Sequence, residues 1–112
     1  MNWNKITSVE QLQTIKAESE TQPVLIFKHS TTCSISATAL DRFERGHAKM
    51  GEDKGVKFYY LDLLNHRDIS REIAQEFNVQ HESPQAILIK SEKAVYDASH
   101  YEINIADVFE KA

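Results

Sequence analysis

A short apolar run that leads into a polar turn and a helical pattern is the feature that most constrains the fold of this chain. Residues 24–27 read Val-Leu-Ile-Phe, and such a continuous apolar run is typical of a central strand covered on both faces. Residues 28–36, Lys-His-Ser-Thr-Thr-Cys-Ser-Ile-Ser, follow it and contain the only cysteine of the protein. The pattern therefore predicts that Cys33 lies where a buried strand passes into a helix. The positive field of a helix N-terminus favours the thiolate, which is the nucleophilic form of cysteine.

Apolar spacing predicts further elements before this strand. A helix is expected over residues 9–18, with Ser8 as its N-cap and Gln11 as the capping-box partner. Residues 3–6 are expected to form either a short first strand or a packed arm. After the strand, residues 30–32 make a turn whose hydroxyl groups are placed to cap the next helix.

The helix after the turn is expected to extend to about residue 50. Ile35, Ala39 and Phe43 are spaced four residues apart in it and are predicted to share its buried face. Residues 51–55 then form a glycine-bracketed loop, and residues 56–62 read as an aromatic-rich strand.

The C-terminal half is expected to contain a helix, a strand hairpin and a last short helix. Asn65 is predicted to cap the first of these helices and Asn104 the last. Between them, residues 85–90 and 93–98 read as two antiparallel strands joined by a tight turn.

The predicted order is helix, strand, helix, strand, helix, strand, strand, helix. The strand–helix–strand unit favours a right-handed parallel crossover, and the hairpin adds an antiparallel edge. This is the layout of a thioredoxin-like α/β fold: one domain over residues 1–112 with a central mixed sheet of about four strands flanked by helices. That fold places a reactive cysteine at the start of the helix after the first core strand and a proline before the penultimate strand. Cys33 and Pro84 occupy those places.

Charge and composition narrow the class of protein. The net charge is -4 and basic residues are scattered among acids, which argues against a nucleic-acid partner. The apolar runs are about four residues long, far short of the roughly 20 needed to span a bilayer. The N-terminal residues lack the layout of a signal peptide. A single cysteine excludes an intramolecular disulfide, so we expect a reducing, cytoplasmic setting.

Cys33 has two interpretations. A lone cysteine is often a small buried hydrophobe. Here its neighbours Thr32, Ser34 and Ser36 carry hydroxyl groups, and it precedes Ile35, the first apolar position of the helix. A thiol at a helix start among hydroxyl groups favours a reactive role, with Thr32 and Ser34 as supporting residues.

Ser36 stands where a Cys-x-x-Cys enzyme has its second thiol. It is either an ordinary surface serine or the residue that replaces a resolving cysteine. In the second case a mixed disulfide at Cys33 cannot be released by internal attack and must be cleared by an outside thiol. Ser36 is also placed to donate a hydrogen bond to the thiolate.

Several polar residues are candidates for contact with a ligand near the thiol. Pro84 is either a plain strand-start proline or a cis-proline that leaves the backbone of Ser83 free to pair with an incoming thiol. Lys28 and His29 either stabilise the thiolate and bind an anionic ligand or form a solvated strand end. His81 is open to the same two readings. No histidine–cysteine pair has metal-ligand spacing, so no metal site is expected.

Residues 32–36, Thr-Cys-Ser-Ile-Ser, together with residues 81–85, His-Glu-Ser-Pro-Gln, resemble the bacillithiol system redox-active proteins, or monothiol bacilliredoxins of the YtxJ type. The resemblance extends over essentially the whole chain. The motif of that family is usually Thr-Cys-Pro-Ile-Ser, so Ser34 stands where the family has proline. The restored N–H of Ser34 is placed to contact the thiolate.

The resemblance implies a cytoplasmic protein that removes bacillithiol from S-bacillithiolated proteins. Cys33 would take bacillithiol as a mixed disulfide, and a second bacillithiol or a bacillithiol-dependent reductase would clear it. Bacillithiol would be a co-substrate, with no tightly bound cofactor and no nucleic-acid or membrane partner, and the chain would be a monomer or weak dimer. Bacillithiol carries a malate group, for which Lys28, His29 and the N–H groups of the helix start are candidate donors.

Two other functions remain open from the residues. A thioredoxin-fold adaptor would have a passive Cys33 that reacts slowly with iodoacetamide. A dimeric iron–sulfur carrier similar to monothiol glutaredoxins would hold a cluster between two copies with added thiols. The Gly-Phe pair that follows the cysteine in such glutaredoxins is absent here.

Overall fold

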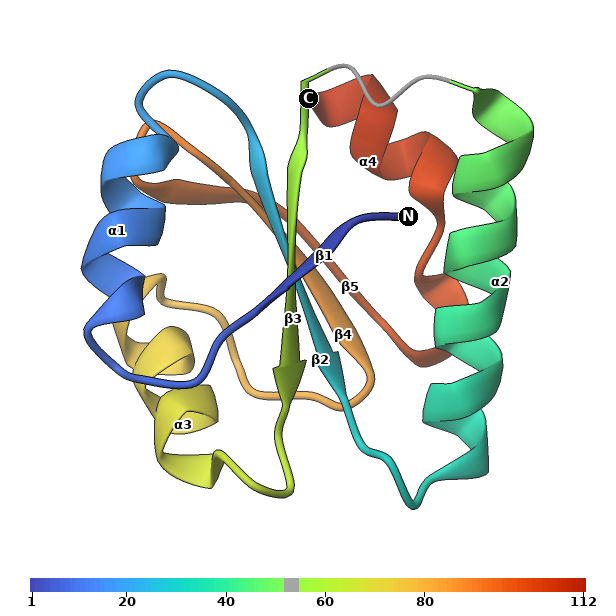
Figure 1. The fold of residues 1–112 in the computed structure, drawn as a ribbon, viewed down its shortest axis with the longest axis horizontal. Coiled ribbons are helices and arrows are strands. Elements are labelled where there is room, and N and C mark those ends of the chain that lie inside the picture. The colour runs from blue at the N-terminus through green and yellow to red at the C-terminus, as the bar shows by residue number, and fades with distance from the viewer. Residues whose placement is uncertain (52–54) are drawn as a thin grey trace.

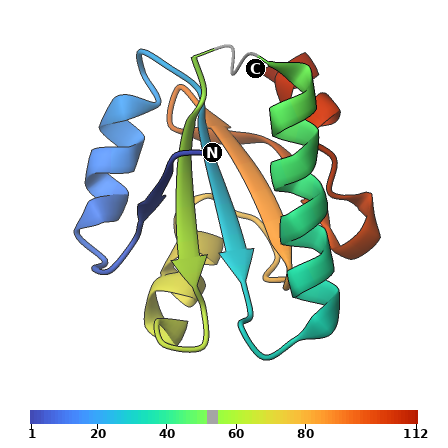
Figure 2. The same cartoon turned by 45° about the vertical axis from the view of Figure 1, so that its right-hand side comes forward.

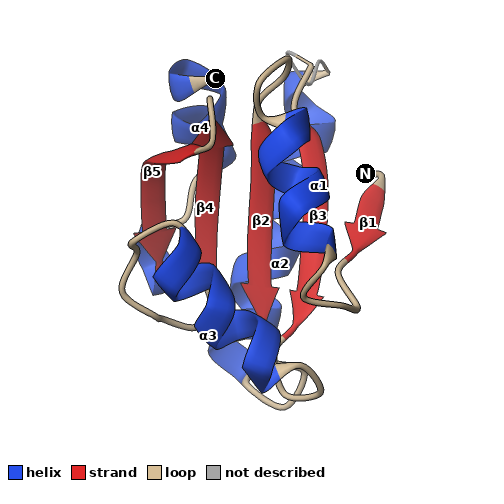
Figure 3. Ribbon diagram, turned by 90° about the vertical axis from the view of Figure 1, so that its left-hand side faces the viewer, coloured by secondary structure: helices blue, strands red, loops and turns tan. Residues whose placement is uncertain are grey.

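The computed structural model describes residues 1–51 and 55–112, and the strands in this part of the chain form one mixed sheet. Their order across the sheet is β1-β3-β2-β4-β5, as Figure 3 shows beneath α1 and α3. β1 and β2 are parallel to β3, whereas β4 is antiparallel to both β2 and β5. The strands are β1 (Trp3–Lys5), β2 (Val24–His29), β3 (Lys57–Asp62), β4 (Gln85–Lys90) and β5 (Lys93–Ser99). The fold is the expected thioredoxin-like one, with one strand more than the predicted four.

The additional strand is β1, which the sequence left as either a strand or an arm. It pairs with β3 in the register Trp3↔Phe58. The indole of Trp3 stacks on Phe43 at a centroid distance of 6.1 Å and meets Phe27 edge-on at 5.9 Å. The indole N–H donates to Oε2 of Glu44 at 2.8 Å. This one side chain therefore attaches the N-terminal segment to both the sheet and α2.

Helices cover both faces of the sheet. α1 and α3 lie on one face, and α2 and α4 lie on the other (Figure 1). The helices are α1 (Gln11–Glu18), α2 (Ser34–Met50), α3 (Arg67–Glu76), the 3₁₀ helix η1 (His100–Glu102) and α4 (Ile105–Lys111). The 17-residue α2 follows β2 directly, so the strand–turn–helix unit predicted around Cys33 is present.

The alternation of side chains along β2 divides the core into two clusters. Val24 and Ile26 pack in the cluster under α1 and α3, whereas Leu25 and Phe27 pack in the cluster under α2 and α4. Successive residues of a strand point to opposite faces, and every residue of β2 is buried. The apolar run is thus explained by a central strand with a helix layer on each side.

Three of the predicted helix starts can be compared with the structure. Asn104 caps α4 as expected, because its Oδ1 accepts from the N–H of Ala106 at 2.8 Å. The prediction for Asn65 was wrong, since His66 is the N-cap of α3. The amide of Asn65 instead donates to Oδ2 of Asp62 at 2.8 Å.

The start of α1 also differs from the prediction. Glu10 is the N-cap and its side chain makes no capping bond. Gln11 supplies half of the expected capping box, because its Oε1 accepts from the N–H of Ser8 at 3.0 Å. It also accepts from the N–H of Thr7 at 2.6 Å, so one amide closes the turn without help from the serine hydroxyl.

Two turns contain residues in the left-handed region. Ser91 and Glu92 have φ of 51° and 67° and form the tight turn predicted between β4 and β5. Gly51 has φ of 72° and ends α2, where glycine adopts this conformation without strain. Of the loop predicted over residues 51–55, residues 52–54 lie outside the described residues. In the part that is described, no helix is long and apolar enough to cross a bilayer.

Candidate functional site

Cys33 is the N-cap residue of α2 and is partly exposed. Its backbone is extended, with φ of −104° and ψ of 122°, and its N–H donates to the carbonyl oxygen of Ser30 at 3.2 Å. Its own carbonyl oxygen accepts the first helical bond, from the N–H of Ala37 at 3.0 Å. Among the described residues, neither the side chain of Cys33 nor a hydroxyl group of residues 30–32 makes a capping bond, so the expected capping is absent. Figure 2 shows the turn that joins the end of β2 to the start of α2, and these backbone bonds place Cys33 at the helix end of that turn.

The residues that flank the thiol are open to solvent. Thr32 and Ser34 are exposed on either side of Cys33. Ile35 is 40% exposed, so its predicted place on the buried face of α2 was wrong. The buried line of the helix starts at Ser36 and continues through Ala39 and Phe43. An apolar side chain therefore lies open to solvent two residues after the thiol.

Ser36 is fully buried, so the alternative of a surface serine is wrong. Its Oγ lies 2.7 Å from Nδ1 of His29 and accepts from the N–H of Ser30 at 3.0 Å. Burial lowers the pKa of His29, against the opposing charges of Asp62 and Glu44. A neutral imidazole and a hydroxyl group can each donate or accept, so Nδ1 of His29 and Oγ of Ser36 share one hydrogen bond while Oγ also accepts from Ser30. This hydroxyl joins the end of β2 to the first turn of α2.

The Ser83–Pro84 peptide bond is cis, as predicted, and Pro84 is buried. Pro84 stands immediately before β4, the strand next to β2. The Oγ of Ser83 is buried and has no hydrogen-bond partner in the described part of the chain. The loop before β4 thus places a polar group without a hydrogen-bond partner in the described chain near the end of the central strand β2.

Lys28 and His29 are adjacent in sequence but lie on opposite faces of the sheet. His29 contacts Ser36 on the α2 face. Lys28 is fully buried on the other face, where its Nζ donates to the carbonyl oxygen of Ser70 at 3.2 Å and lies 3.3 Å from Nδ1 of His81. Burial lowers the pKa of Lys28 to about 8. The alternative of a solvated strand end is therefore wrong for both residues, and they belong to two separate clusters.

Ser70 is the one member of the Lys28 cluster that the sequence did not single out. It lies on α3 and is buried, and its Oγ is 3.1 Å from Nδ1 of His81. Two features of the sequence could have pointed to Ser70. Lys28 continues the alternation of Val24 and Ile26, which places its side chain on the α3 face. A buried ammonium on that face then requires hydrogen-bond acceptors from the helix that covers it.

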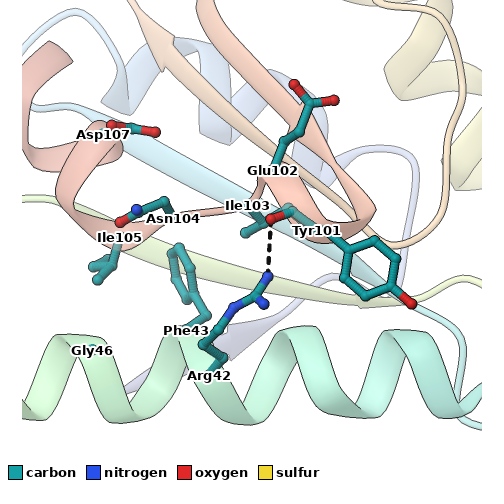
Figure 4. Close-up of a pocket in the computed structure, with 9 residues that line it drawn as sticks. All are labelled: Arg42, Phe43, Gly46, Tyr101, Glu102, Ile103, Asn104, Ile105 and Asp107. Carbon is teal, nitrogen blue, oxygen red and sulfur yellow. Dashed lines mark hydrogen bonds between the residues drawn. The ribbon is translucent and has the colours of Figure 1, made fainter.

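Among the hollows formed by the described residues, two lie on opposite faces of the sheet near residues of interest, and Cys33 lines neither. One, of about 370 Å³, lies between α2 and the segment from η1 to α4 (Figure 4). Across it the guanidinium of Arg42 donates to the carbonyl oxygen of Tyr101 at 3.2 Å. The other, of about 180 Å³, lies on the α3 face beside His81. Within the described residues, no group of three or more His, Cys, Asp or Glu side chains is arranged to hold a metal ion.

This geometry suits thiol–disulfide exchange with an outside disulfide. A partly exposed thiol lies at the start of a 17-residue helix, and the strand before it ends next to the strand that follows a cis-proline. The position three residues later holds a buried hydroxyl group in place of a second sulfur. Because the chain has one cysteine, a mixed disulfide at Cys33 is released only by a second molecule.

Comparison with solved structures defines the class. A structure described as "A putative oxidoreductase with a thioredoxin fold" is 33% identical to this chain, with a TM-score of 0.81, and the match covers 97% of this chain and 92% of that one. Thioredoxins from Malassezia sympodialis and Trypanosoma brucei brucei show the same fold, at 16% and 24% identity and TM-scores of 0.73 and 0.67. These matches cover 97% and 98% of this chain and 86% and 87% of the two thioredoxins. The protein is therefore of the thioredoxin-fold class.

Within that class, a model of the family described as "Monothiol bacilliredoxin BrxC" matches residues 4–108. The chain belongs to the monothiol bacilliredoxin family.

Proposed function

We propose that this protein removes bacillithiol from S-bacillithiolated proteins by accepting it as a mixed disulfide on Cys33. The observation that carries the proposal is the partly exposed thiol of Cys33 at the start of α2, in a chain with no second cysteine. Membership of the monothiol bacilliredoxin family supports bacillithiol as the small thiol. The setting that fits a free, reduced thiol is the cytoplasm.

The reaction consists of two exchange steps. In the first, the Cys33 thiolate attacks the bacillithiol sulfur of the client mixed disulfide. The client sulfur leaves as a thiolate and takes up a proton, while a disulfide forms between Cys33 and bacillithiol. In the second, the thiolate of another bacillithiol attacks the bacillithiol sulfur of this adduct. Oxidised bacillithiol leaves and the Cys33 thiolate is restored, so two electrons pass from bacillithiol to the client cysteine.

The neighbours of Cys33 have distinct supporting roles in this cycle. The open sides formed by Thr32 and Ser34 give a bulky client access to the thiol. Ser36 fixes the first turn of α2 through its bonds to His29 and Ser30, and it cannot resolve the adduct. The second step therefore depends on bacillithiol itself or on a bacillithiol-dependent reductase.

The loop that contains Pro84 is the proposed docking site for the incoming thiol. Ser83 offers a buried Oγ with no partner in the described chain, and its place before β4 is beside the end of β2. An extended thiol that pairs there would satisfy this group. Lys28 and His81 contact each other on the far face of the sheet. A ligand bound by Lys28 or His81 would therefore lie on the α3 face and not against the Cys33 thiolate.

The test is the release of bacillithiol from a purified S-bacillithiolated client. Wild-type protein with excess bacillithiol is expected to free the client cysteine, and Cys33→Ala is expected to be inactive. Because Cys33 is the only cysteine, wild-type protein treated with iodoacetamide is a matched control with an unchanged sequence. Release by Cys33→Ala at the wild-type rate would contradict the proposal and leave an adaptor role in its place.

A further inference from the structure

The hollow on the α3 face is basic. It is lined by Leu63, Arg67, Ser70, Arg71 and His81. Arg67 and Arg71 are exposed and four residues apart on α3, so their guanidinium groups share one side of the helix. Among the residues that the structure describes, neither guanidinium has a hydrogen-bond or ion-pair partner. Two like charges at this spacing destabilise a helix unless something neutralises them.

A further cation, Lys28, contacts two of the residues that line the hollow. Nζ of Lys28 lies 3.3 Å from Nδ1 of His81, and Oγ of Ser70 lies 3.1 Å from the same atom. Lys28 is fully buried and has a carbonyl oxygen and an imidazole as its partners, with no carboxylate among them. A protein of net charge -4 thus concentrates positive charge at a hollow that no acidic side chain lines.

The contact with Lys28 also determines which ring nitrogen of His81 carries the proton. An ammonium group can only donate, so Nδ1 of His81 accepts and the proton of the neutral ring is on Nε2. Burial and then the charge of Lys28 lower the pKa of His81, against the pull of Glu82, which keeps the ring neutral. Glu82 itself lies 3.8 Å from Nε2 of His100. Among the described residues Nε2 of His81 has no hydrogen-bond partner, so its N–H is left as a donor.

We propose that this hollow binds an oxyanion, a carboxylate or phosphate group, through the guanidinium groups of Arg67 and Arg71 and the Nε2–H of His81. Arginine side chains bind both groups in bidentate geometry, and the buried ammonium beneath adds to the attraction. Cys33 does not line the hollow, so the site is separate from the exchange chemistry, and a carboxylate of the small thiol as its ligand rests on the proposed function. The oxyanion is either a carboxylate of the small thiol that Cys33 accepts or a free anion of the cell.

The test is a titration followed by nuclear magnetic resonance. Inorganic phosphate, L-malate and reduced bacillithiol are added separately at neutral pH, and the amide signal of Ser70 and the ring signals of His81 are recorded. Saturable shifts are expected, with affinity lowered about tenfold or more in Arg67→Gln and in Arg71→Gln. Arg45→Gln is the matched control, because Arg45 is an exposed helix arginine that pairs with Asp41 at 3.0 Å. It should bind as the wild type does.

The three probes distinguish the sources of the oxyanion. Binding of malate and bacillithiol without phosphate supports a carboxylate of the thiol, whereas equal binding of phosphate and malate supports a free anion. Shifts that do not saturate, or equal affinity in the Arg67→Gln/Arg71→Gln double variant, would overturn the site. Cys33→Ser is expected to bind the probes as the wild type does, so failure here is separable from failure of the chemistry at Cys33.

Discussion

Ser36 links the first turn of α2, which follows Cys33, to the end of β2. Its hydroxyl has two partners, His29 and Ser30, at the end of β2. These bonds hold the first turn of α2 against the strand that leads into it. A thiol at a helix N-cap depends on this junction, because the side chain of Cys33 makes no capping bond of its own.

Ser36→Ala is expected to lower the free energy of unfolding by about 2 kcal/mol. The change leaves the N–H of Ser30 and Nδ1 of His29 without partners in a buried site, and each such loss costs about 1–3 kcal/mol. Urea unfolding measures the effect. Ser34→Ala, at an exposed position two residues earlier, is the matched control and should change stability by less than about 0.5 kcal/mol. Equal effects of the two changes would show that the buried hydroxyl bonds are unimportant.

Ser34 is the position at which this chain departs from the Thr-Cys-Pro-Ile-Ser motif of the family it resembles. It is the first residue of α2, where proline loses no helical hydrogen bond. Cys33 before it has ψ of 122°, in the region that a residue before proline adopts. Ser34→Pro is therefore expected to raise stability by about 0.4–1 kcal/mol. A loss of stability in thermal or urea unfolding would mean that the N–H of Ser34 makes a contact needed by the fold.

Lys28 makes the stability of the protein depend on pH in alkaline solution, because burial disfavours its charged form. Burial lowers its pKa from 10.5 to about 8. Between those values the unfolded chain binds a proton that the folded chain does not, so this residue makes stability rise with pH. Relative to Lys28→Met, wild-type protein should gain stability from pH of about 8 to 10.5 and show no such gain below that window. The exposed Lys93→Met is the control and should show no pH-dependent difference.

At the scale of elements, β2 explains why two adjacent polar residues serve two different clusters. Its alternation sends Phe27 and His29 toward α2 and sends Ile26 and Lys28 toward α3. The strand therefore ends with His29, which is neutral and contacts α2, and with Lys28, whose buried ammonium group contacts α3. One strand therefore contacts both the helix that begins after Cys33 and the residues that line the basic hollow, on opposite faces of the sheet.

The contact between α2 and α4 depends on a glycine. A Cβ atom at Gly46 would lie 2.6 Å from Cγ2 of Ile105, which is buried. Gly46→Ala gains up to about 1 kcal/mol of helix propensity, but overpacking typically costs about 1–3 kcal/mol. We expect a net loss of about 1 kcal/mol in urea unfolding.

The same change in an Ile105→Ala background is the matched test. Removal of Cγ2 opens the space, so Gly46→Ala should then stabilise the protein by up to about 1 kcal/mol. A reversal of sign between the two backgrounds identifies the contact as the cause. A loss of the same size in both would show that Gly46 is needed for another reason.

The elements themselves could be predicted because their signals are local. The apolar run of β2, the hairpin turn and the cap at Asn104 each depend on neighbouring residues. The position of Cys33 followed from the same signals. The N-cap predictions at Ser8 and Asn65 were wrong because several neighbouring polar residues could cap each helix, and the backbone conformation begins the helices after Glu10 and His66 instead.

The contacts of the site could not be predicted in this way, because they join residues that are distant in sequence. Lys28 meets Ser70 and His81 across separations of 42 and 53 residues. A lysine at the end of a strand usually reaches solvent, and only the cover provided by α3 buries it. Likewise, Ser36 is buried because it lies on the same face of α2 as Ala39 and Phe43, which its spacing from Cys33 does not reveal.

At the scale of the whole molecule, the two faces of the sheet have different chemical character. The α2 face has the partly exposed thiol of Cys33 at the start of α2 and the hydrogen-bonded pair of His29 and Ser36 behind it. The α3 face has a basic hollow with a buried cation beneath. The loop from His81 to Pro84 is the part of the chain that connects them, since it begins at the hollow and ends at the cis-proline.

The choice of small thiol is the central claim, and intact-mass analysis tests it most directly. The reduced protein is exposed to oxidised bacillithiol or, separately, to oxidised glutathione at equal concentration. We predict one bacillithiol adduct on Cys33, none in Cys33→Ser, and slower or absent modification by glutathione. Equal modification by the two disulfides would contradict selection of bacillithiol, and an unmodified wild-type protein would contradict a reactive Cys33.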